Sequence, residues 1–510
     1  MRPLVRIALD KGGSFLPGKT NIFHSALLLT GVNLLLRTVS TSFQVYISGQ
    51  LGAAGVGLLQ LVLSVGMLAM TAGIAGVRTA TMYLTAEELG KKQPHNVVWV
   101  LSGCFLYSIL CSGAIAAMLY FFAPAICQNW IGDIRTVGAV RLLAAFLPVS
   151  CLCGVMTGYF TAANRIGTLA AVEVAEQGIS MAVTMAALTL WAKQDPGKAC
   201  QAVVLGSGTG SCLTLCALCY LRLRQHAGSG ERIPVRNRLL QTAVPLALAD
   251  DLKSGISTLE NLMVPKRLAL FAGTVSPLAA FGMVCGMVFP ILMFPAAIVF
   301  GLNELLIPEL ARCAAAESHT RIRYLVKRSL HCVVVYGCFI CGGEFLLSAY
   351  LCRTLYNNAS AGEYLQLYAL LIPMLYCDAL TDAMTKGLGQ QKACVRYNIL
   401  TSSMDVILLF LLLPRFGMQG YFFSFLVTHI LNFFLSLRRL LKISKASISL
   451  KMPALTLIAT AGAIWICSHL QNALISCGAY MIVFSCLLFL LRVLKKEDIL
   501  WLKGLIATKR

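Results

Sequence analysis

Two basic residues lie within long apolar runs, where a charge is costly if the run crosses a membrane. Arg37 is near the middle of the run 24–47, and Lys253 lies in the run 240–263. A charge at the centre of a bilayer costs about 2.5–3.5 kcal/mol on insertion scales, so it faces a wet cavity or a partner. A guanidinium donates two parallel hydrogen bonds to a phosphate, and an ammonium acts as a point charge. Arg37 and Lys253 are therefore predicted to bind a phosphate or pyrophosphate headgroup.

Acidic residues also occur within the apolar runs. Six of them are candidates for ion coupling or charge balance: Glu173, Glu176, Asp250, Asp251, Asp378 and Asp382. The two glutamates are three residues apart and the last two aspartates are four apart, so each of these pairs shares a helix face. Either pair is a candidate site for Na⁺ or H⁺, whereas the adjacent aspartates can instead neutralise Lys253. Both interpretations stay open at this point.

The sequence carries no pattern of catalytic or metal-binding residues. The Cys-x-x-Cys pairs Cys216/Cys219 and Cys338/Cys341 fall inside apolar runs, which favours buried small side chains over metal ligands. There is no Gly-x-x-x-x-Gly-Lys-[Ser/Thr] loop for nucleotide phosphates. We therefore expect no catalytic residue, no metal and no cofactor apart from a Na⁺ or H⁺ coupling ion.

The composition is that of a polytopic membrane protein. Hydrophobic residues make up 58% of the 510 residues and charged residues 12%, and the mean hydropathy is +0.77. A soluble chain of this length carries about twice that share of charge. The net charge of +21 does not indicate nucleic-acid binding, because the basic residues lie between apolar runs, where they orient the chain and contact anionic lipid.

About 20 apolar residues cross the ~30 Å hydrocarbon core as a helix. By this length criterion the sequence predicts an all-α fold with about fourteen transmembrane helices. The predicted spans are 24–47, 56–77, 97–122, 137–158, 168–191, 200–221, 240–263, 277–302, 330–351, 365–388, 398–413, 420–437, 453–470 and 474–491.

The basic residues alternate between the two sides of these spans. Thirty-two of the 42 Lys and Arg residues fall on one side, in loops and termini and, for Lys386, in the last turn of a span; seven fall on the other side and three lie deeper within spans. Basic residues concentrate on the cytoplasmic side of membrane proteins. Both termini are therefore predicted to be cytoplasmic, and the first span is expected to be retained rather than cleaved as a signal peptide.

The predicted spans divide into two six-helix lobes and two further helices. The proposed segments are a cytoplasmic N-terminal segment (1–23), the N-lobe (24–221), an inter-lobe loop (222–239), the C-lobe (240–441), two more helices (453–491) and a basic amphipathic tail (492–510). A shift of 221 residues places Gly52 on Gly273 and brings Lys253 within about a turn and a half of Arg37. Because each lobe has six helices, the repeats are expected to be parallel and related by a pseudo-twofold axis along the membrane normal.

The sequence Leu-Leu-Arg that ends at Arg37, followed by Gln-Leu-Gly-Ala-Ala-Gly-Val-Gly-Leu at 50–58, resembles the MOP flippase superfamily. Within it, the chain is similar to the group of stage V sporulation protein B and related polysaccharide and peptidoglycan-precursor flippases. This resemblance implies alternating access through a central cleft in the bacterial cytoplasmic membrane. The implied substrate is a lipid-linked oligosaccharide, either a lipid II-like precursor or a polysaccharide unit on undecaprenyl pyrophosphate, used in cell-wall or spore-cortex synthesis. The implied partners are membrane lipids, with cell-wall synthesis proteins as further candidates. The protein is expected to be a monomer.

Two other functions are compatible with the same features. One is an ion-coupled multidrug or metabolite exporter of the same superfamily. The other is a membrane glycosyl-polymer ligase, but the predicted outer loops are short and hold few acidic or histidine residues for catalysis. A transporter that is not an enzyme is therefore the favoured interpretation.

Overall fold

The structure is a computed structural model that describes residues 19–91, 93–192, 195–224, 235–273, 276–447, 449, 451–470 and 472–493; only the backbone of 19–33 is described. All regular elements in these ranges are helices. Eight of the described helices are long and apolar enough to cross a membrane, or up to ten if two bent pairs each count as one span. The prediction of an all-α polytopic fold is confirmed, and the count of fourteen stays a prediction.

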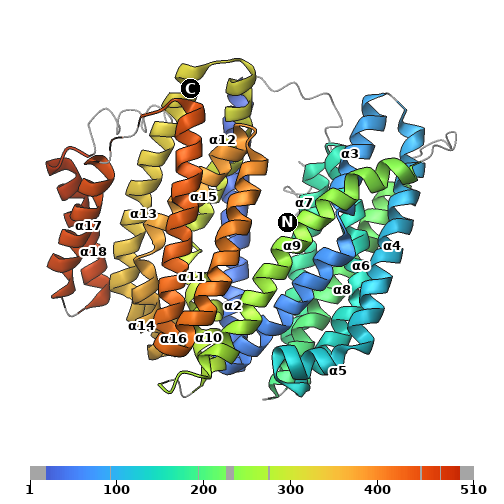
Figure 1. Ribbon diagram of the computed structural model, residues 1–510, viewed down its shortest axis with the longest axis horizontal. Helices are drawn as coiled ribbons and strands as arrows, with labels where there is room; N and C mark the ends of the chain where they lie inside the picture. Colours follow the sequence, from blue (N-terminus) through green and yellow to red (C-terminus); the bar gives the residue numbers. More distant parts are fainter. Residues whose placement is uncertain are drawn as a thin grey trace, which may run out of the picture. The chain divides into compact units, whose positions relative to one another are not determined.

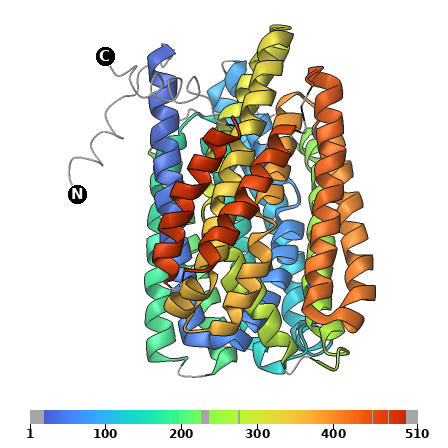
Figure 2. The same cartoon turned by 90° about the vertical axis from the view of Figure 1, so that its left-hand side faces the viewer.

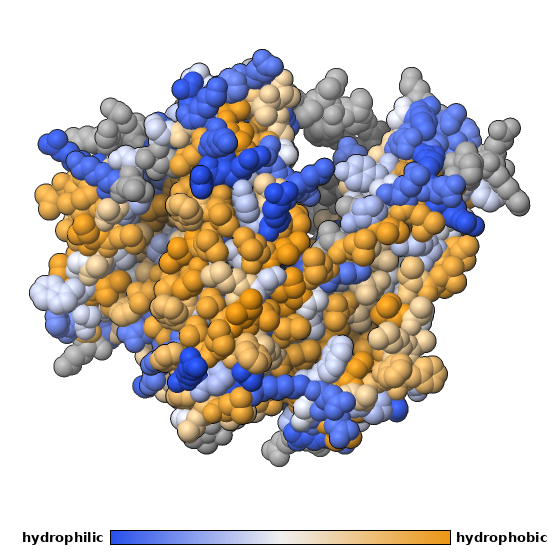
Figure 3. All heavy atoms as spheres, viewed as in Figure 1, coloured by the Kyte–Doolittle hydropathy of each residue, from blue (hydrophilic) through white to orange (hydrophobic). Residues whose placement is uncertain are grey.

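The described residues fall into two compact units. The first comprises residues 50–266, and the second joins residues 19–49 to residues 267–493. In Figure 3, hydrophobic side chains fill the middle of the visible surface of each unit, and hydrophilic ones gather toward the two ends of its helices. This distribution is expected for helices that cross a bilayer.

The first unit is a bundle of helices around one buried core (Figure 1). Its helices are the second part of α2 (Lys19–Ile74), α3 (Val77–Gly90), α4 (Val97–Phe121), α5 (Ala123–Ile126), α6 (Val137–Ala162), α7 (Ile166–Leu190), α8 (Pro196–Leu223) and α9 (Arg236–Leu268), with short turns at Pro94–Asn96, Cys127–Ile131 and Ile134–Thr136. Val77, Val100, Phe160 and Leu218 are fully buried where α3, α4, α6 and α8 meet. α9 is not among the eight apolar spans, and it carries four charged residues between Asp250 and Glu260.

The turn between α2 and α3 fixes how closely α9 can approach. Gly76 has a φ of +70°, and a Cβ on it would lie only 2.4 Å from the carbonyl oxygen of Ala243 on α9. Glycine is the only residue that adopts this backbone conformation without strain and leaves room for the neighbouring backbone. The Gly76 turn therefore lets α9 lie directly against the end of α2.

The second unit contains the first part of α2 and the remaining helices. These are α10 (Pro277–Met283), a π-helical turn (Val284–Val288), α11 (Phe289–Leu292), α12 (Ala296–Ala315), α13 (His319–Tyr356), α14 (Ala359–Ala369), α15 (Ile372–Gly387), α16 (Gln391–Ser444), α17 (Lys451–Ser468) and α18 (Ala473–Leu490). Figure 2 shows α17 and α18, in red, against α13, in yellow. The Tyr480 hydroxyl of α18 donates a hydrogen bond to the Cys338 carbonyl of α13 at 2.8 Å.

Glycine residues interrupt the helices between predicted spans, and proline residues bend them within the predicted spans 277–302 and 365–388. Non-helical dihedral angles at Gly52 (φ 66°, ψ 175°) and Gly417 (φ 57°, ψ −139°) divide α2 and α16 into two helices each. Bends of 61° and 55° separate α11 from α12 and α14 from α15, next to Pro295 and Pro373. Proline removes a backbone donor and clashes with the preceding turn, so bends at these positions are expected. Gly52, in the glycine-rich sequence 50–58, thus separates two helices.

The compact units differ from the sequence segments 24–221 and 240–441. The first part of α2 opens the segment 24–221 but belongs to the second unit. α9 opens the segment 240–441, but as far as Lys266 it belongs to the first unit. An apolar run gives the position of a helix but not the neighbours against which it packs. Residues 1–18 of the N-terminal segment, 225–234 of the inter-lobe loop and 494–510 of the tail lie outside the described residues. The predicted pseudo-twofold axis stays a prediction.

Candidate functional site

The first unit contains a cavity of about 950 Å³ between α2, α3 and α9. Eleven of its sixteen lining residues are polar or charged: Gln60, Ser64, Thr71, Arg78, Thr79, Asp250, Lys253, Ser254, Ser257, Thr258 and Asn261. The others are Leu63, Met67, Met70, Ile74 and Gly76. The volume is in the range of small-molecule sites, but the lining is more polar than such sites usually are, so it suits a polar headgroup.

Hydrogen bonds between hydroxyl and amide groups hold the two main walls of this cavity together. Thr71 Oγ1 donates to Ser254 Oγ at 3.2 Å, and Thr258 Oγ1 donates to the Ser64 carbonyl at 3.1 Å. Asn261 Nδ2 donates to Ser64 Oγ at 3.0 Å. These contacts recur along α9, so its polar side chains line the cavity and fix α9 against α2.

Lys253, predicted from the sequence as a headgroup contact, lines this cavity together with Asp250. Among the described residues Lys253 forms no ion pair with Asp250 or Asp251. Asp251 does not line the cavity, and its buried Oδ1 has no hydrogen-bond partner in the described part of the chain. No ion pair with a described residue therefore occupies the ammonium of Lys253, while Asp250 lies on the same wall. Ligand binding by Lys253 and its neutralisation by the adjacent aspartates both stay predictions.

Arg78 follows directly on the predicted span 56–77, so sequence reasoning places it in a loop and does not identify it as a cavity residue. The chain leaves α2 through Ala75 and Gly76, both with positive φ, and α3 begins at Val77. This turn brings Arg78 and Thr79 onto the cavity wall. Gly76, two residues before Arg78, is a candidate sequence signal for this turn, but Gly73 shows no such turn and remains within α2.

Arg37, the other predicted headgroup contact, is exposed on the first part of α2. This segment belongs to the second unit, whereas Lys253 belongs to the first. The pairing of Arg37 with Lys253 stays a prediction.

The predicted glutamate pair on α7 is not a pair of equivalent carboxylates. Glu176 accepts hydrogen bonds from Thr214 Oγ1 at 2.8 Å and from Ser211 Oγ at 3.3 Å, both on α8. Glu173 is exposed. Glu176 therefore links α7 to α8, while the neighbouring carboxylate remains at the surface.

The predicted aspartate pair on α15 also has separate partners. Asp378 is buried and accepts hydrogen bonds from Asn432 Nδ2 at 2.9 Å, and its Oδ2 lies 3.0 Å from His429 Nδ1. Asp382 instead forms an ion pair with Lys386 at 2.6 Å. His429 and Asn432 lie on α16, more than 50 residues along the chain, so spacing within α15 could not reveal them.

A third aspartate extends this network within α16. Asp405 Oδ1 accepts hydrogen bonds from Ser424 Oγ at 2.5 Å and from Thr428 Oγ1 at 3.3 Å. Thr428 is next in sequence to His429, so the two carboxylate sites adjoin each other. Hydroxyl, amide and imidazole groups thus surround these carboxylates.

The cysteines and the wider set of metal-ligand residues show no metal centre within the described ranges. No group of three or more His, Cys, Asp or Glu residues there is arranged to hold a metal ion. Cys338 and Cys341 are buried, and all cysteines of the two Cys-x-x-Cys pairs are free thiols.

Comparisons with known proteins agree with this fold. Residues 30–190 match the family model described as MatE. Stage V sporulation protein B of Bacillus subtilis (strain 168) is 21% identical in an alignment that covers 94% of this chain and 97% of that protein. The match therefore spans nearly the full length of both proteins.

Two solved structures share the fold at low identity. The lipid II flippase MurJ, in an inward closed conformation, aligns with a TM-score of 0.68 and 12% identity over 90% of this chain and 98% of that one. A multidrug resistance MATE family transporter of the MOP superfamily, in an inward-facing conformation, aligns with a TM-score of 0.64 and 12% identity over 87% and 99%. At these identities the likeness concerns the fold.

Proposed function

We propose that this chain is a transport protein of the MOP flippase superfamily and not an enzyme. Its proposed activity is to move a lipid-linked oligosaccharide across the membrane. The proposed substrate is a lipid II-like peptidoglycan precursor or a polysaccharide unit on undecaprenyl pyrophosphate. The full-length similarity to stage V sporulation protein B and the fold shared with a lipid II flippase support this choice over other substrates of the superfamily.

The observation that carries the proposal is the polar cavity of the first unit. Lys253 and Arg78 supply positive charge on its wall, and serine, threonine, asparagine and glutamine side chains supply donors and acceptors. A pyrophosphate needs charge-assisted hydrogen bonds, and a sugar needs many neutral ones. This cavity offers both kinds of group, and Arg37 is proposed as a further headgroup contact.

A multidrug exporter is the second candidate, because the MatE match and a solved MATE transporter support it equally at the level of the family. Sites for drug-like molecules are lined mostly by hydrophobic and aromatic side chains. None of the sixteen lining residues is aromatic. The composition of the wall therefore favours a glycolipid headgroup over a hydrophobic drug.

The proposal includes a location and an energy source. We place the chain in the bacterial cytoplasmic membrane with both termini inside, on the distribution of 32 basic residues on one side against seven on the other. Transport is proposed to be coupled to Na⁺ or H⁺, with Asp378 and its partners His429 and Asn432 as the candidate site. Membrane lipids are partners by necessity, and cell-wall synthesis proteins are further candidates.

A flipping assay with fluorescent lipid II in proteoliposomes tests this function. Wild-type protein should move the lipid between leaflets, and Lys253→Gln should reduce the initial rate about tenfold, as expected for losing a charge-assisted hydrogen bond of about 1.5 kcal/mol. Lys198→Gln, an exposed cation outside the cavity, is the matched control and should retain the wild-type rate. Export of a cationic dye by the same vesicles without any lipid II movement would favour the multidrug exporter instead.

A further inference from the structure

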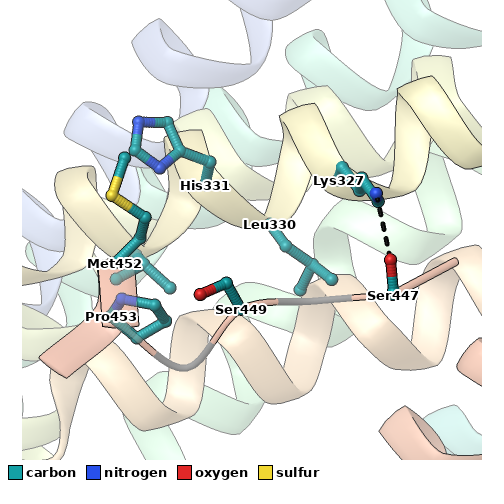
Figure 4. Close-up of a pocket in the computed structure, with 8 residues that line it drawn as sticks. Lys327, Leu330, His331, Ser447, Ser449, Met452 and Pro453 are labelled. Carbon is teal, nitrogen blue, oxygen red and sulfur yellow. Dashed lines mark hydrogen bonds between the residues drawn. The ribbon is translucent and has the colours of Figure 1, made fainter. Parts of the chain in front are cut away.

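A second cavity, of about 250 Å³, lies in the second unit between α13 and residues that follow α16 and begin α17 (Figure 4). Lys327, Leu330, His331 and Val334 form its α13 wall. Their spacing of three, one and three residues places all four on one helix face. The opposite wall consists of Ser447, Ser449, Met452 and Pro453.

The lining divides into a polar and an apolar part. Lys327 Nζ donates a hydrogen bond to Ser447 Oγ at 3.3 Å, as Figure 4 shows. An ammonium has three donors, so two of them remain for a ligand, beside the Ser449 hydroxyl and the His331 ring. No carboxylate lines the cavity, whereas Leu330, Val334, Met452 and Pro453 offer carbon surface. The pocket therefore suits an anion that is joined to an apolar body.

The surrounding sequence is basic on both walls. Neither 318–334 nor 442–453 contains an Asp or Glu residue. Arg323, Lys327, Lys442, Lys445 and Lys451 are all exposed there. Such a concentration of cations next to apolar spans attracts anionic lipid, at about 1 kcal/mol for each basic residue near the surface.

The predicted span 330–351 places the cavity at the expected level of a lipid headgroup. The apolar part of α13 begins at about Leu330, so Lys327 is one turn outside it and Val334 one turn inside. α17 begins at Lys451 and carries exposed apolar side chains, among them Leu457 and Ile458, at 52% and 63% exposure. Acyl chains attached to a headgroup in the cavity would find such surfaces beside it.

We propose that this cavity binds the phosphate headgroup of an anionic phospholipid from the leaflet that faces the basic loops. Lys327 and the serine hydroxyls hold the phosphate oxygens, and the Leu330, Val334, Met452 and Pro453 side chains contact the glycerol and the first methylenes. The volume fits a small headgroup, since sites for whole drug-sized ligands begin at about 300 Å³. This site is separate from the cavity proposed for the transported lipid and does not depend on that function.

Native mass spectrometry of the full-length protein, titrated with phosphatidylglycerol or phosphatidylcholine, tests the proposal. We expect one phosphatidylglycerol to bind more tightly than the zwitterionic lipid. Lys327→Gln should raise the Kd for phosphatidylglycerol about fivefold, whereas Lys442→Gln, which removes an exposed cation outside the cavity, should change it less than twofold. Equal effects of the two variants would mean general surface attraction and would overturn the proposal.

A second variant reduces the volume of the cavity without changing its charge. Ser449→Phe keeps every cation but fills the cavity, so it should weaken phosphatidylglycerol binding at least as much as Lys327→Gln. Unchanged binding in Ser449→Phe protein would overturn the assignment to this cavity. Inorganic phosphate tests whether the site binds a free anion instead of a lipid. Displacement of the lipid by millimolar phosphate would indicate a site for a free anion and contradict the lipid site. Failure of phosphate to displace the lipid supports the lipid site.

Discussion

Charged residues within the predicted spans have different surroundings in the two units. In the first unit, Asp250 and Lys253 on α9 lie along a cavity of about 950 Å³. In the second unit, Asp378 and Asp405 have hydrogen-bond partners on α16 within 3.0 Å. Charges on an open wall remain available to a ligand, whereas charges in a hydrogen-bonded network stabilise the packing in addition to forming the proposed coupling-ion site. The same residue types therefore have different expected effects on mutation in the two units.

The largest expected effect is a loss of stability when Gly76, in the turn beside the cavity, is replaced. Gly76→Ala should lower the free energy of unfolding by about 3 kcal/mol, because a side chain at φ +70° is strained and its Cβ would clash with the Ala243 carbonyl. Unfolding titrations in mixed micelles measure this. Gly113→Ala is the control, since no atom lies within 4 Å of its added Cβ, and it should be neutral or stabilising. Equal stability of the two variants would mean that α9 does not depend on this close approach.

The next effect tests the network of the second unit. Asp378→Ala leaves His429 and Asn432 without their acceptor and should cost about 2–3 kcal/mol of stability, because unpaired buried polar groups are destabilising. Asp250→Ala, on the cavity wall, should stay within about 0.5 kcal/mol of wild type. The same unfolding measurement compares them. If Asp250→Ala were the more destabilising of the two, the difference between the units would be reversed.

A smaller effect concerns Glu176, which belongs to the first unit but has internal partners. Thr214→Val removes its shorter hydrogen bond and should cost about 1 kcal/mol. Thr189→Val is the matched control, because that hydroxyl is exposed and bonds only to its own helix backbone. Comparable melting temperatures for the two variants would show that Glu176 does not link α7 to α8.

The sequence predicts the helices well because length and apolarity determine whether a helix can cross a membrane. It also singles out Lys253, which lines the cavity, since a charge in an apolar run requires water or a partner. The contact of Lys253 with a headgroup stays a prediction. Two findings depend on tertiary packing and lie beyond such reasoning. The partners of Asp378 are 51 and 54 residues away on another helix, and Arg78 reaches the cavity only through the turn at Gly76. The grouping of α9 with residues 50–266 likewise follows from its contacts and not from its position in the sequence.

The central claim is that the cavity of the first unit binds the headgroup of a pyrophosphate-linked lipid. Its most direct test is the Kd of purified, folded protein for lipid II, compared between wild type, Lys253→Gln and the control Lys198→Gln at matched protein concentration. We predict that Lys253→Gln keeps the wild-type free energy of unfolding within about 0.5 kcal/mol and raises the Kd about tenfold, while Lys198→Gln changes neither. An unchanged Kd in well-folded Lys253→Gln protein would contradict the account.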